Sequence, residues 1–438
     1  MTSSRPAEFR RDLGVTFTGQ VSAVAVTLIG SIVLARMLGP SGRGAVQVLQ
    51  LLTAEVALIV SLGLPVAVTY VIARQEATAA TVASTATLMS LLVGSTVAVA
   101  LALAAGPLAS LFLSDIEGGA LLVVISSVMI PLTVLESIFL SVWRGRNKFY
   151  AFNGFKLFAR CGYLGGIVGA AVLGTDVTTV VFGLIAADVV TTVVLAVALF
   201  TRFDEPLRID RVVARRLLHF NVAGHGGTLL QEVSYRLDMF IVAGLLGSRA
   251  VGLYAIAVST SRLLWYIPES LGSVLLSRSA RTGYRRERWE RIGQGVTSIL
   301  LFQAIGAAAL APVAIPLVFG VAFKGSVWPF ILLLPGAVAL GLWKVFINET
   351  TAAGHPRLKL RSGGVGSAAT VILDVMLIPQ WGVEGAAVAS SVAYCLTLGV
   401  LLLQLRTIYG IPLHALLMPK VTVLRTLLPT RRSAPADG

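Results

Sequence analysis

The sequence predicts an all-α, polytopic membrane protein: twelve transmembrane helices in two six-helix bundles related by a pseudo-two-fold axis along the membrane normal. Three observations predict this fold class. Of the 438 residues, 56% are hydrophobic and only 13% are charged, with a mean hydropathy of +0.86, which lies outside the range of soluble domains. Twelve apolar runs are long enough to cross a bilayer, and a glycine-rich motif that follows the first run recurs near the middle of the chain.

The apolar runs define the predicted helices, since a bilayer needs about 20 apolar residues per span. They cover roughly residues 14–36, 44–73, 79–105, 119–143, 150–174, 177–201, 217–247, 250–278, 292–320, 326–349, 361–382 and 383–408. The break between the last two runs depends on the polar and glycine-containing segment 380–385. The first run is too long for a signal-peptide core and is interpreted as a retained span.

Basic residues alternate between the two sides of this topology. The side that holds both termini and the even-numbered loops carries 26 of the 35 Lys and Arg residues, and six lie within spans. The opposite loops carry three, which are Arg43, Arg249 and Lys324. Because Lys and Arg remain on the cytoplasmic side, we expect a multi-pass protein of the plasma (inner) membrane with both termini cytoplasmic. The net charge of +14 follows from the same bias, and no nucleic-acid partner is expected.

The repeated motif divides the chain into two similar parts. Residues 38–44 (LGPSGRG) and 246–252 (LGSRAVG) lie 208 residues apart, and each ends one apolar run and precedes the next. Leu62-Gly63 and Gly145 recur at an offset of 209. With six spans per part, the repeats are parallel, as in transporters that bind substrate between two halves. The predicted parts are an N-terminal bundle (1–203), a cytoplasmic amphipathic linker (204–216), a C-terminal bundle (217–410) and a cytoplasmic tail (411–438).

Several segments in order along the chain resemble those of polysaccharide-biosynthesis oligosaccharide flippases, which belong to the multidrug/oligosaccharidyl-lipid/polysaccharide exporter superfamily. They are residues 32–44, Arg236-Leu237-Asp238, Gly252-Leu253-Tyr254, Gly354-His355-Pro356 and residues 377–387. The resemblance implies two six-helix bundles around a central cavity that works by alternating access on a lipid-linked sugar. The related peptidoglycan-precursor group usually carries two further spans, which this chain lacks.

Charged residues within the spans are candidates for the substrate site, because an ionised side chain at the bilayer centre costs about 3 kcal/mol on insertion scales. In the resembled fold, spans one, two, seven and eight border the cavity. Inward-facing arginines there would bind the pyrophosphate of a polyprenyl-linked sugar through planar, paired hydrogen bonds. The predicted substrate-binding residues are Arg262, Arg236, Glu55, Asp238, Tyr266, Lys344 and Arg160. Within this set, Asp238 is expected to orient Arg236, and Tyr266 shares a helix face with Arg262.

A structural interpretation of the same charges stays open. Internal ion pairs such as Glu232–Arg236 would neutralise one another and fix helix register. Lys156 and Lys344 lie nearer the cytoplasmic side, where lysine side chains can extend to the interface. The acids Glu136, Asp188 and Asp374 would pair with cations or form a proton relay.

The predicted function is a flippase that moves a polyprenyl-pyrophosphate-linked oligosaccharide from the cytoplasmic to the outer leaflet for cell-surface polysaccharide biosynthesis. The alternative is a cation-coupled exporter of drugs or other small molecules, which would favour acidic cavity charges. An enzyme is not expected, because the loops are short and no phosphate-binding glycine loop or metal-type histidine spacing occurs. No cofactor or metal is expected. The expected partners are the lipid-linked oligosaccharide, membrane lipids and the polymerase or glycosyltransferase machinery, and the protein is expected to be a monomer.

Overall fold

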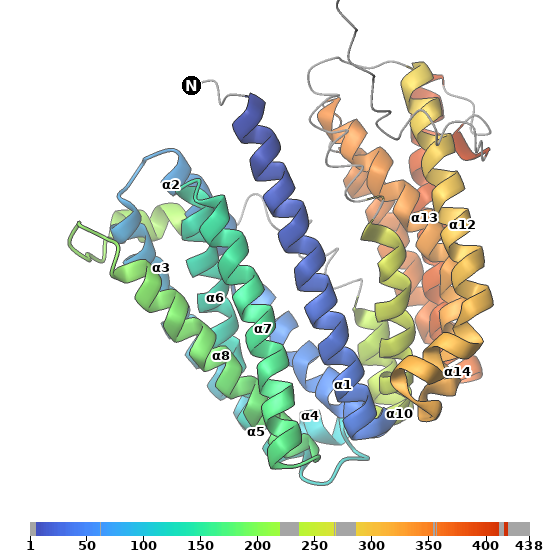
Figure 1. Ribbon diagram of the computed structural model, residues 1–438, viewed down its shortest axis with the longest axis horizontal. Coiled ribbons are helices and arrows are strands. Elements are labelled where there is room, and N and C mark those ends of the chain that lie inside the picture. The colour runs from blue at the N-terminus through green and yellow to red at the C-terminus, as the bar shows by residue number, and fades with distance from the viewer. Residues whose placement is uncertain are drawn as a thin grey trace, which may run out of the picture. The chain divides into compact units, whose positions relative to one another are not determined.

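The computed structural model describes residues 6–61, 63–219, 236–266, 268, 286–353, 355, 357–410 and 416–418, and their regular structure is helical (Figure 1). Within these residues, nine helical segments are long and apolar enough to cross a membrane. They are Ser22–Ser61, Ala79–Leu103, Gly119–Gly145, Phe149–Leu173, Val177–Phe200, Leu237–Trp265, Trp289–Phe319, Val321–Thr350 and Arg357–Tyr409. The all-α, multi-pass fold class is therefore confirmed.

The chain divides into two compact units. Unit 1 comprises Met1–Leu253 and Val318–Phe323, and unit 2 comprises Tyr254–Leu317 and Lys324–Gly438. Because the division falls inside one helix, it separates the chain at a different place from the predicted bundles 1–203 and 217–410, and those domain boundaries stay a prediction. The predicted tail lies almost wholly outside the described residues.

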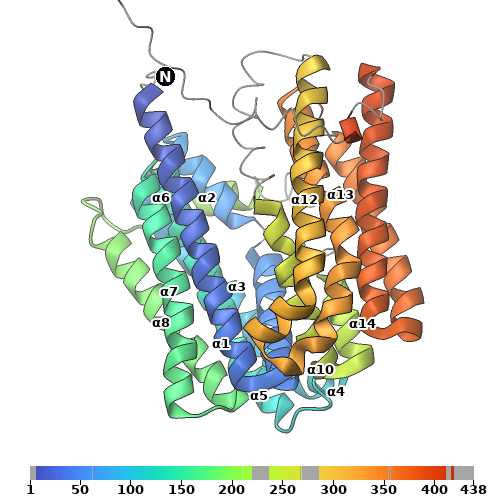
Figure 2. The same cartoon turned by 45° about the vertical axis from the view of Figure 1, so that its right-hand side comes forward.

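From α1 to α8, unit 1 consists of helices joined by short connections (Figure 2). The helices of unit 1 are α1 (Pro6–Ser61), α2 (Leu64–Ala73), α3 (Ala79–Leu103), α4 (Ala105–Phe112), α5 (Gly119–Ser127), α6 (Met129–Gly145), α7 (Phe149–Leu173), α8 (Val177–Phe200) and the start of α10 (Leu237–Ser261). Unit 2 contains the end of α10, η1 (Arg262–Trp265), α12 (Arg286–Phe319), the end of η2 (Val321–Ser326), α13 (Val327–Ala352) and α14 (Arg357–Tyr409).

Three of these helices are interrupted by glycines with positive φ, at the predicted breaks between spans one and two, seven and eight, and eleven and twelve. These are Gly39 (φ 62°, ψ −173°), Gly247 (φ 77°, ψ 179°) and Gly382 (φ 58°, ψ −133°). Residues that carry a side chain rarely adopt a positive φ, whereas glycine, which has no Cβ atom, does so without strain. The uncertain break at 380–385 therefore coincides with a real interruption of the helix.

The chain reverses direction at the break in α1. A Cβ atom on Gly30 would lie 3.0 Å from the Tyr163 ring, and Gln50 donates a hydrogen bond to the Tyr163 hydroxyl at 3.4 Å. In a straight helix, residues 30 and 50 would be about 30 Å apart and could not reach one side chain. Helix α1 is thus a hairpin of two antiparallel segments that both pack on α7.

The two copies of the repeated motif pack against each other within unit 1. A Cβ atom on Gly44 would overlap the carbonyl oxygen of Ser248, and one on Gly252 would overlap that of Pro40. At the offset of 208, Gly44 is equivalent to Gly252 and Pro40 to Ser248. The contact is therefore reciprocal, with each copy placing its glycine on the backbone of the other. We call this contact the glycine crossing.

Two predicted spans are each divided into two helices. The span 44–73 is interrupted at Gly63, whose φ of 72° ends the helical path before α2 begins at Leu64. The span 119–143 is divided at Val128, three residues before Pro131, into α5 and α6. Proline lacks the backbone N–H and clashes with the preceding turn, which explains the second interruption.

The segment after α8 contains the predicted linker. Residues 211–219 are helical, and the Asp210 carboxylate accepts a hydrogen bond from the Val212 backbone N–H at 2.6 Å. Val213 and Leu217 are buried in the apolar core of unit 1, whereas Val212 is exposed. This segment is thus part of the packed body of unit 1.

Candidate functional site

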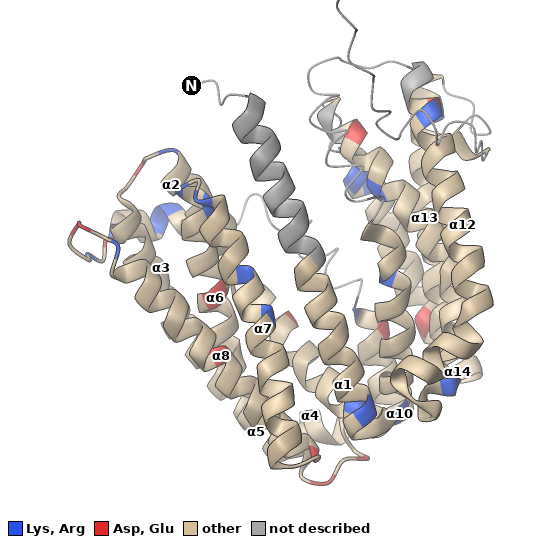
Figure 3. Ribbon diagram, viewed as in Figure 1, with Lys and Arg blue, Asp and Glu red and all other residues tan. Residues whose placement is uncertain are grey.

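Charges within the described spans are sparse, so each one that is buried stands out (Figure 3). The best-defined pair joins Glu55 of α1 to Arg236, which directly precedes α10. Arg236 Nε lies 2.9 Å from Glu55 Oε1, and the Glu55 side chain is 7% exposed against 36% for Arg236. Sequence reasoning expected these two residues to approach each other, and they do. Glu232, the alternative partner of Arg236, lies outside the described residues.

Asp238 occupies the first turn of α10, two residues after Arg236. It is buried, and its carboxylate accepts a hydrogen bond at 2.7 Å from the backbone N–H of Met239. A carboxylate at a helix N-terminus is favoured by the helix dipole and by the unpaired N–H groups there. Asp238 therefore stabilises the start of α10, and its expected role in orienting Arg236 stays a prediction.

In unit 2, Arg262 begins the short 3₁₀ turn η1, in the span that contains α10. Its side chain is half-buried, and its Nε is buried with no hydrogen-bond partner among the described residues. Tyr266, directly after the turn, is 36% exposed. A 3₁₀ stretch inside a helix often marks a hinge or local strain. Glu269, expected on the same face, lies outside the described residues.

Lys344 approaches η1 from α13. Its Nζ lies 4.4 Å from the centroid of the Trp265 ring, within the range of a cation–π interaction. Trp265 is held in place by a hydrogen bond from its Nε1 to the Ala337 carbonyl at 3.0 Å and by edge contact with Tyr394. Lys344 thus contacts the same short turn, η1, that Arg262 begins, and both lie in unit 2. The predicted convergence of Arg262 with Glu55 and Arg236 involves both units and stays a prediction.

Arg160 of α7 lies in an environment that favours the ion-pair interpretation. The Arg160 guanidinium interacts electrostatically with the carboxylates of Glu136 on α6 and Asp188 on α8, which also interact with each other. Lys156, one turn before Arg160, carries a like charge that opposes it. Glu136 and Asp188 are therefore the opposite charges near Arg160 inside unit 1. Its role in substrate binding stays a prediction.

Arg43 is a residue that sequence reasoning placed wrongly. The apolar-run boundaries assigned it to an outer loop, but it lies within α1 and is only 5% exposed. Its Nη1 donates a hydrogen bond to Gln47 Oε1 at 2.9 Å, and its Nε has no hydrogen-bond partner among the described residues. The glycine- and proline-rich motif resembled a loop, whereas the chain remains helical directly after Gly39. The sequence feature that could have indicated the burial of Arg43 is its position directly before Gly44, a glycine that recurs in both copies of the motif.

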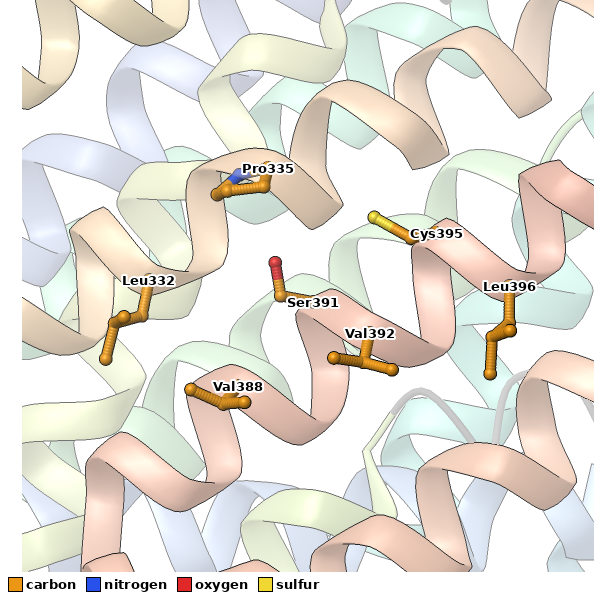
Figure 4. A pocket seen from close by; sticks show the side chains of 7 residues that line it. All are labelled: Leu332, Pro335, Val388, Ser391, Val392, Cys395 and Leu396. Atoms are coloured by element: carbon orange, nitrogen blue, oxygen red, sulfur yellow. The ribbon is translucent and has the colours of Figure 1, made fainter.

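An apolar pocket of about 440 Å³ lies between α13 and α14 (Figure 4). Ser391 projects towards the helix that carries Pro335, and its hydroxyl accepts a hydrogen bond from the Gly336 backbone N–H at 2.7 Å. The polar group in the pocket therefore stabilises the proline-containing turn. The remaining lining residues are Leu332, Val388, Val392, Cys395 and Leu396, which offer no group for an anion or a sugar.

Comparisons with known proteins agree with this architecture. The family model described as polysaccharide biosynthesis protein matches residues 33–328. The fold is similar to that of lipid II flippase MurJ in an inward closed conformation, with a TM-score of 0.77 and 14% identity over 93% of this chain and 90% of that one. It is also similar to an inward-facing multidrug resistance MATE family transporter of the MOP superfamily, with a TM-score of 0.71 and 15% identity over 90% and 95% of the two chains.

A curated relative is an uncharacterized membrane protein of Methanocaldococcus jannaschii, 25% identical over 213 residues. The match covers 45% of this chain and 40% of the relative, so the chain spans about two-fifths of the length of that protein. At these identities, the solved structures establish the shared fold.

Proposed function

The chain belongs to the polysaccharide biosynthesis protein family, and we propose that it is a flippase for a polyprenyl-pyrophosphate-linked oligosaccharide. It would carry this lipid from the cytoplasmic to the outer leaflet by alternating access. The observation that carries the proposal is the half-exposed Arg236, which a buried carboxylate holds inside a membrane-spanning unit. Membership of this family supports a sugar-containing substrate. The arginine provides a positive group that would bind the phosphates of the lipid carrier.

The proposed architecture is twelve spans in two six-helix bundles related by a pseudo-two-fold axis. Of the nine candidate spans in the described residues, the three that contain a glycine break each count as two, which gives twelve. The reciprocal glycine crossing supports the two-fold relation, because equivalent residues make equivalent contacts.

The proposed orientation places both termini in the cytoplasm. Four arginines gather on aromatic rings at the end of unit 1 where α2, α6 and α8 finish, which fits the rule that basic residues stay inside and that aromatic residues lie at the interface. The pairs are Arg74 on Tyr70 (5.3 Å), Arg144 on Phe152 (4.6 Å), Arg146 on Phe203 (5.5 Å) and Arg202 on Trp143 (5.4 Å).

Arg236 is suited to bind a pyrophosphate without first losing its structural partner. A guanidinium has five N–H donors, and the contact with Glu55 uses the Nε side. The terminal nitrogens can then form paired hydrogen bonds with phosphate oxygens while Glu55 keeps the group in position. Arg262 and Lys344 of unit 2 would supply further positive charge to the substrate, and Tyr266 a hydroxyl.

A second candidate is the cation-coupled exporter, and one observation favours it. Glu136 and Asp188 interact inside unit 1, and two neighbouring carboxylates are a common way to bind a proton or a metal cation. Such a site is also compatible with a flippase that uses an ion gradient. The two candidates therefore differ in the substrate that they carry.

The test compares Arg236→Ala and Arg262→Ala in cells that lack the wild-type gene, with the exposed Arg208→Ala as the matched control. Loss of one charged hydrogen bond costs about 1.5–3 kcal/mol, so we expect surface polysaccharide to fall about tenfold or more while the lipid-linked intermediate accumulates. Protein levels should equal those of the control. Normal surface polysaccharide in both variants would contradict the proposal and favour drug export.

A further inference from the structure

Among the arginines whose side chains the structure describes, Arg43 is the most deeply buried, and the proposed mechanism does not use it. It is 5% exposed and lies within a membrane-spanning helix. Within the described part of the chain, its side-chain hydrogen bond goes to Gln47, and the side chain of Tyr163 lies nearby. A guanidinium buried without a carboxylate is costly, because neither water nor a counter-charge compensates its desolvation.

Other arginines of unit 1 show how the same fold usually compensates such a charge. Arg236 has the carboxylate of Glu55 at 2.9 Å. Arg146 lies over the rings of Trp143 and Phe203, at 5.8 and 5.5 Å from their centroids. Arg43 has neither kind of partner among the described residues, and no carboxylate of that part of the chain is paired with it.

The fold does not require a cation at this position. The equivalent of Arg43 in the second copy of the motif, 208 residues later, is Val251, which is 0% exposed. Both positions directly precede a crossing glycine and are closely packed. An apolar side chain therefore satisfies the packing, and the positive charge at Arg43 needs a different explanation.

Two polar side chains near Arg43 on the same helix add hydrogen-bonding groups beside its guanidinium, which are those of Gln47 and Gln50. Because Gln47 accepts the arginine hydrogen bond through Oε1, its amide nitrogen keeps two N–H donors for another acceptor. Gln47 is half-buried, as are Gln50 and Tyr163, which hydrogen-bond to each other beside it. The Arg43 guanidinium and the Gln47 amide nitrogen are hydrogen-bond donors, and none of these four residues is acidic.

We propose that Arg43 and Gln47 form a phosphate-binding subsite that receives the pyrophosphate of the lipid-linked substrate before release into the outer leaflet. This inference rests on the proposed flippase function. Arg43 lies four residues after the turn at Gly39, or about 6 Å from that end of the span, whereas Arg236 lies eleven residues before Gly247, or about 16 Å from the equivalent turn. With the termini cytoplasmic, Arg43 is the outer of the two cations.

The binding test uses the purified full-length chain in nanodiscs of neutral lipid and farnesyl pyrophosphate as the probe. We expect Arg43→Gln to lower the affinity about tenfold or more and Arg43→Lys to lose less, since it keeps the charge. Farnesol, which lacks the phosphates, should bind all variants equally. The exposed Arg249→Gln, in the second copy of the motif, is the matched control and should bind like the wild type.

A stability measurement separates a ligand site from a structural role. Without ligand, Arg43→Met should raise the melting temperature by about 2 °C or more, because it removes an uncompensated buried charge, and it should abolish the stabilisation by farnesyl pyrophosphate. If Arg43→Met instead lowers the melting temperature while Arg43→Gln binds the probe like the wild type, Arg43 is a packing residue and the inference is wrong.

Three further outcomes distinguish a lipid-headgroup site, failure of the proposed flippase function and failure of the Arg43 subsite alone. If phosphatidylglycerol in the nanodisc displaces the probe from the wild type but not from Arg43→Gln, the phosphate that binds there is a lipid headgroup, and the substrate subsite is contradicted. If the wild type fails to bind farnesyl pyrophosphate at all, the proposed flippase function fails together with the subsite. Loss of binding in Arg236→Gln with full binding in Arg43→Gln would reject the subsite alone.

Discussion

The two copies of the glycine motif have nearly the same backbone and different side-chain chemistry. Gly39 and Gly247 adopt φ values of 62° and 77° with extended ψ, and the glycines five residues later contact each other's copy reciprocally. Four residues after the turn, however, the first copy carries a buried arginine and the second a buried valine.

A second difference lies at the position directly after each turn. Pro40 in the first copy has no backbone N–H, whereas Ser248 in the second donates its N–H and its hydroxyl to the Asp115 carboxylate, at 3.0 and 2.9 Å. Both copies thus contain the glycines that the turn and the glycine crossing require. The charged and polar groups that could act on a substrate or hold a loop occur in one copy only.

The largest effect is expected at the glycine crossing, where the copies should behave alike. Gly44→Ala and Gly252→Ala should each destabilise the protein by about 3 kcal/mol, because the new methyl group would overlap a carbonyl oxygen of the other copy. The double variant should cost less than twice as much, since one substitution already separates the backbones. Thermal unfolding of the purified protein measures this.

Gly154→Ala is the control for the crossing, because it lies in α7 with open space around its Cβ position. There the substitution should be neutral or slightly stabilising. A melting temperature for Gly44→Ala as high as that of this control would show that the hairpins do not touch.

An intermediate effect is expected at the turns, where the copies should begin to differ. A Cβ atom on Gly39 would meet open space. Gly39→Ala should therefore lower the free energy of unfolding only through backbone strain, by about 1–2 kcal/mol. Gly247→Ala should cost more, because its Cβ would also lie 3.3 Å from the Asp115 carboxylate. Removing that contact with Asp115→Ala should bring the two costs closer together in the same unfolding assay, and an unchanged difference would exclude it as the cause.

The smallest effect should be confined to the second copy. Asp115→Asn weakens the hydrogen bonds to Ser248 and should cost about 1 kcal/mol. Hydrogen exchange should become faster in a peptide covering residues 246–252 and stay unchanged in one covering 38–44. The exposed Glu117→Gln in the same loop is the control. Faster exchange in both peptides would mean that Asp115 supports the whole crossing.

The sequence predicted the helical, multi-pass class and the glycine breaks because both depend on local signals. Apolar length, turn glycines and the offset of 208 residues placed Gly39 and Gly247 correctly. The interruption at Gly63 was noted only as part of the repeat, since a single glycine in an apolar run does not by itself reveal a positive φ. Partner choice for side chains depends on tertiary packing and was harder to predict.

Arg43 illustrates that difficulty. A motif rich in glycine and proline is typical of a loop, so the burial of Arg43 within a helix escaped prediction. The carboxylates near Arg160 come from two other helices, α6 and α8, whose facing could not be derived from spacing alone. Glu55 and Arg236 were matched because the resembled fold brings their spans together.

The glycine crossing also bears on the protein's ancestry. A contact in which residue 44 touches 248 while 252 touches 40 is the arrangement that two identical chains make across a two-fold axis. Before the duplication, one gene encoding a single half could have made the same contact as a homodimer. Fusion of the two copies then freed each to mutate independently, and a charge such as that of Arg43 could be kept in one copy without being imposed on the other.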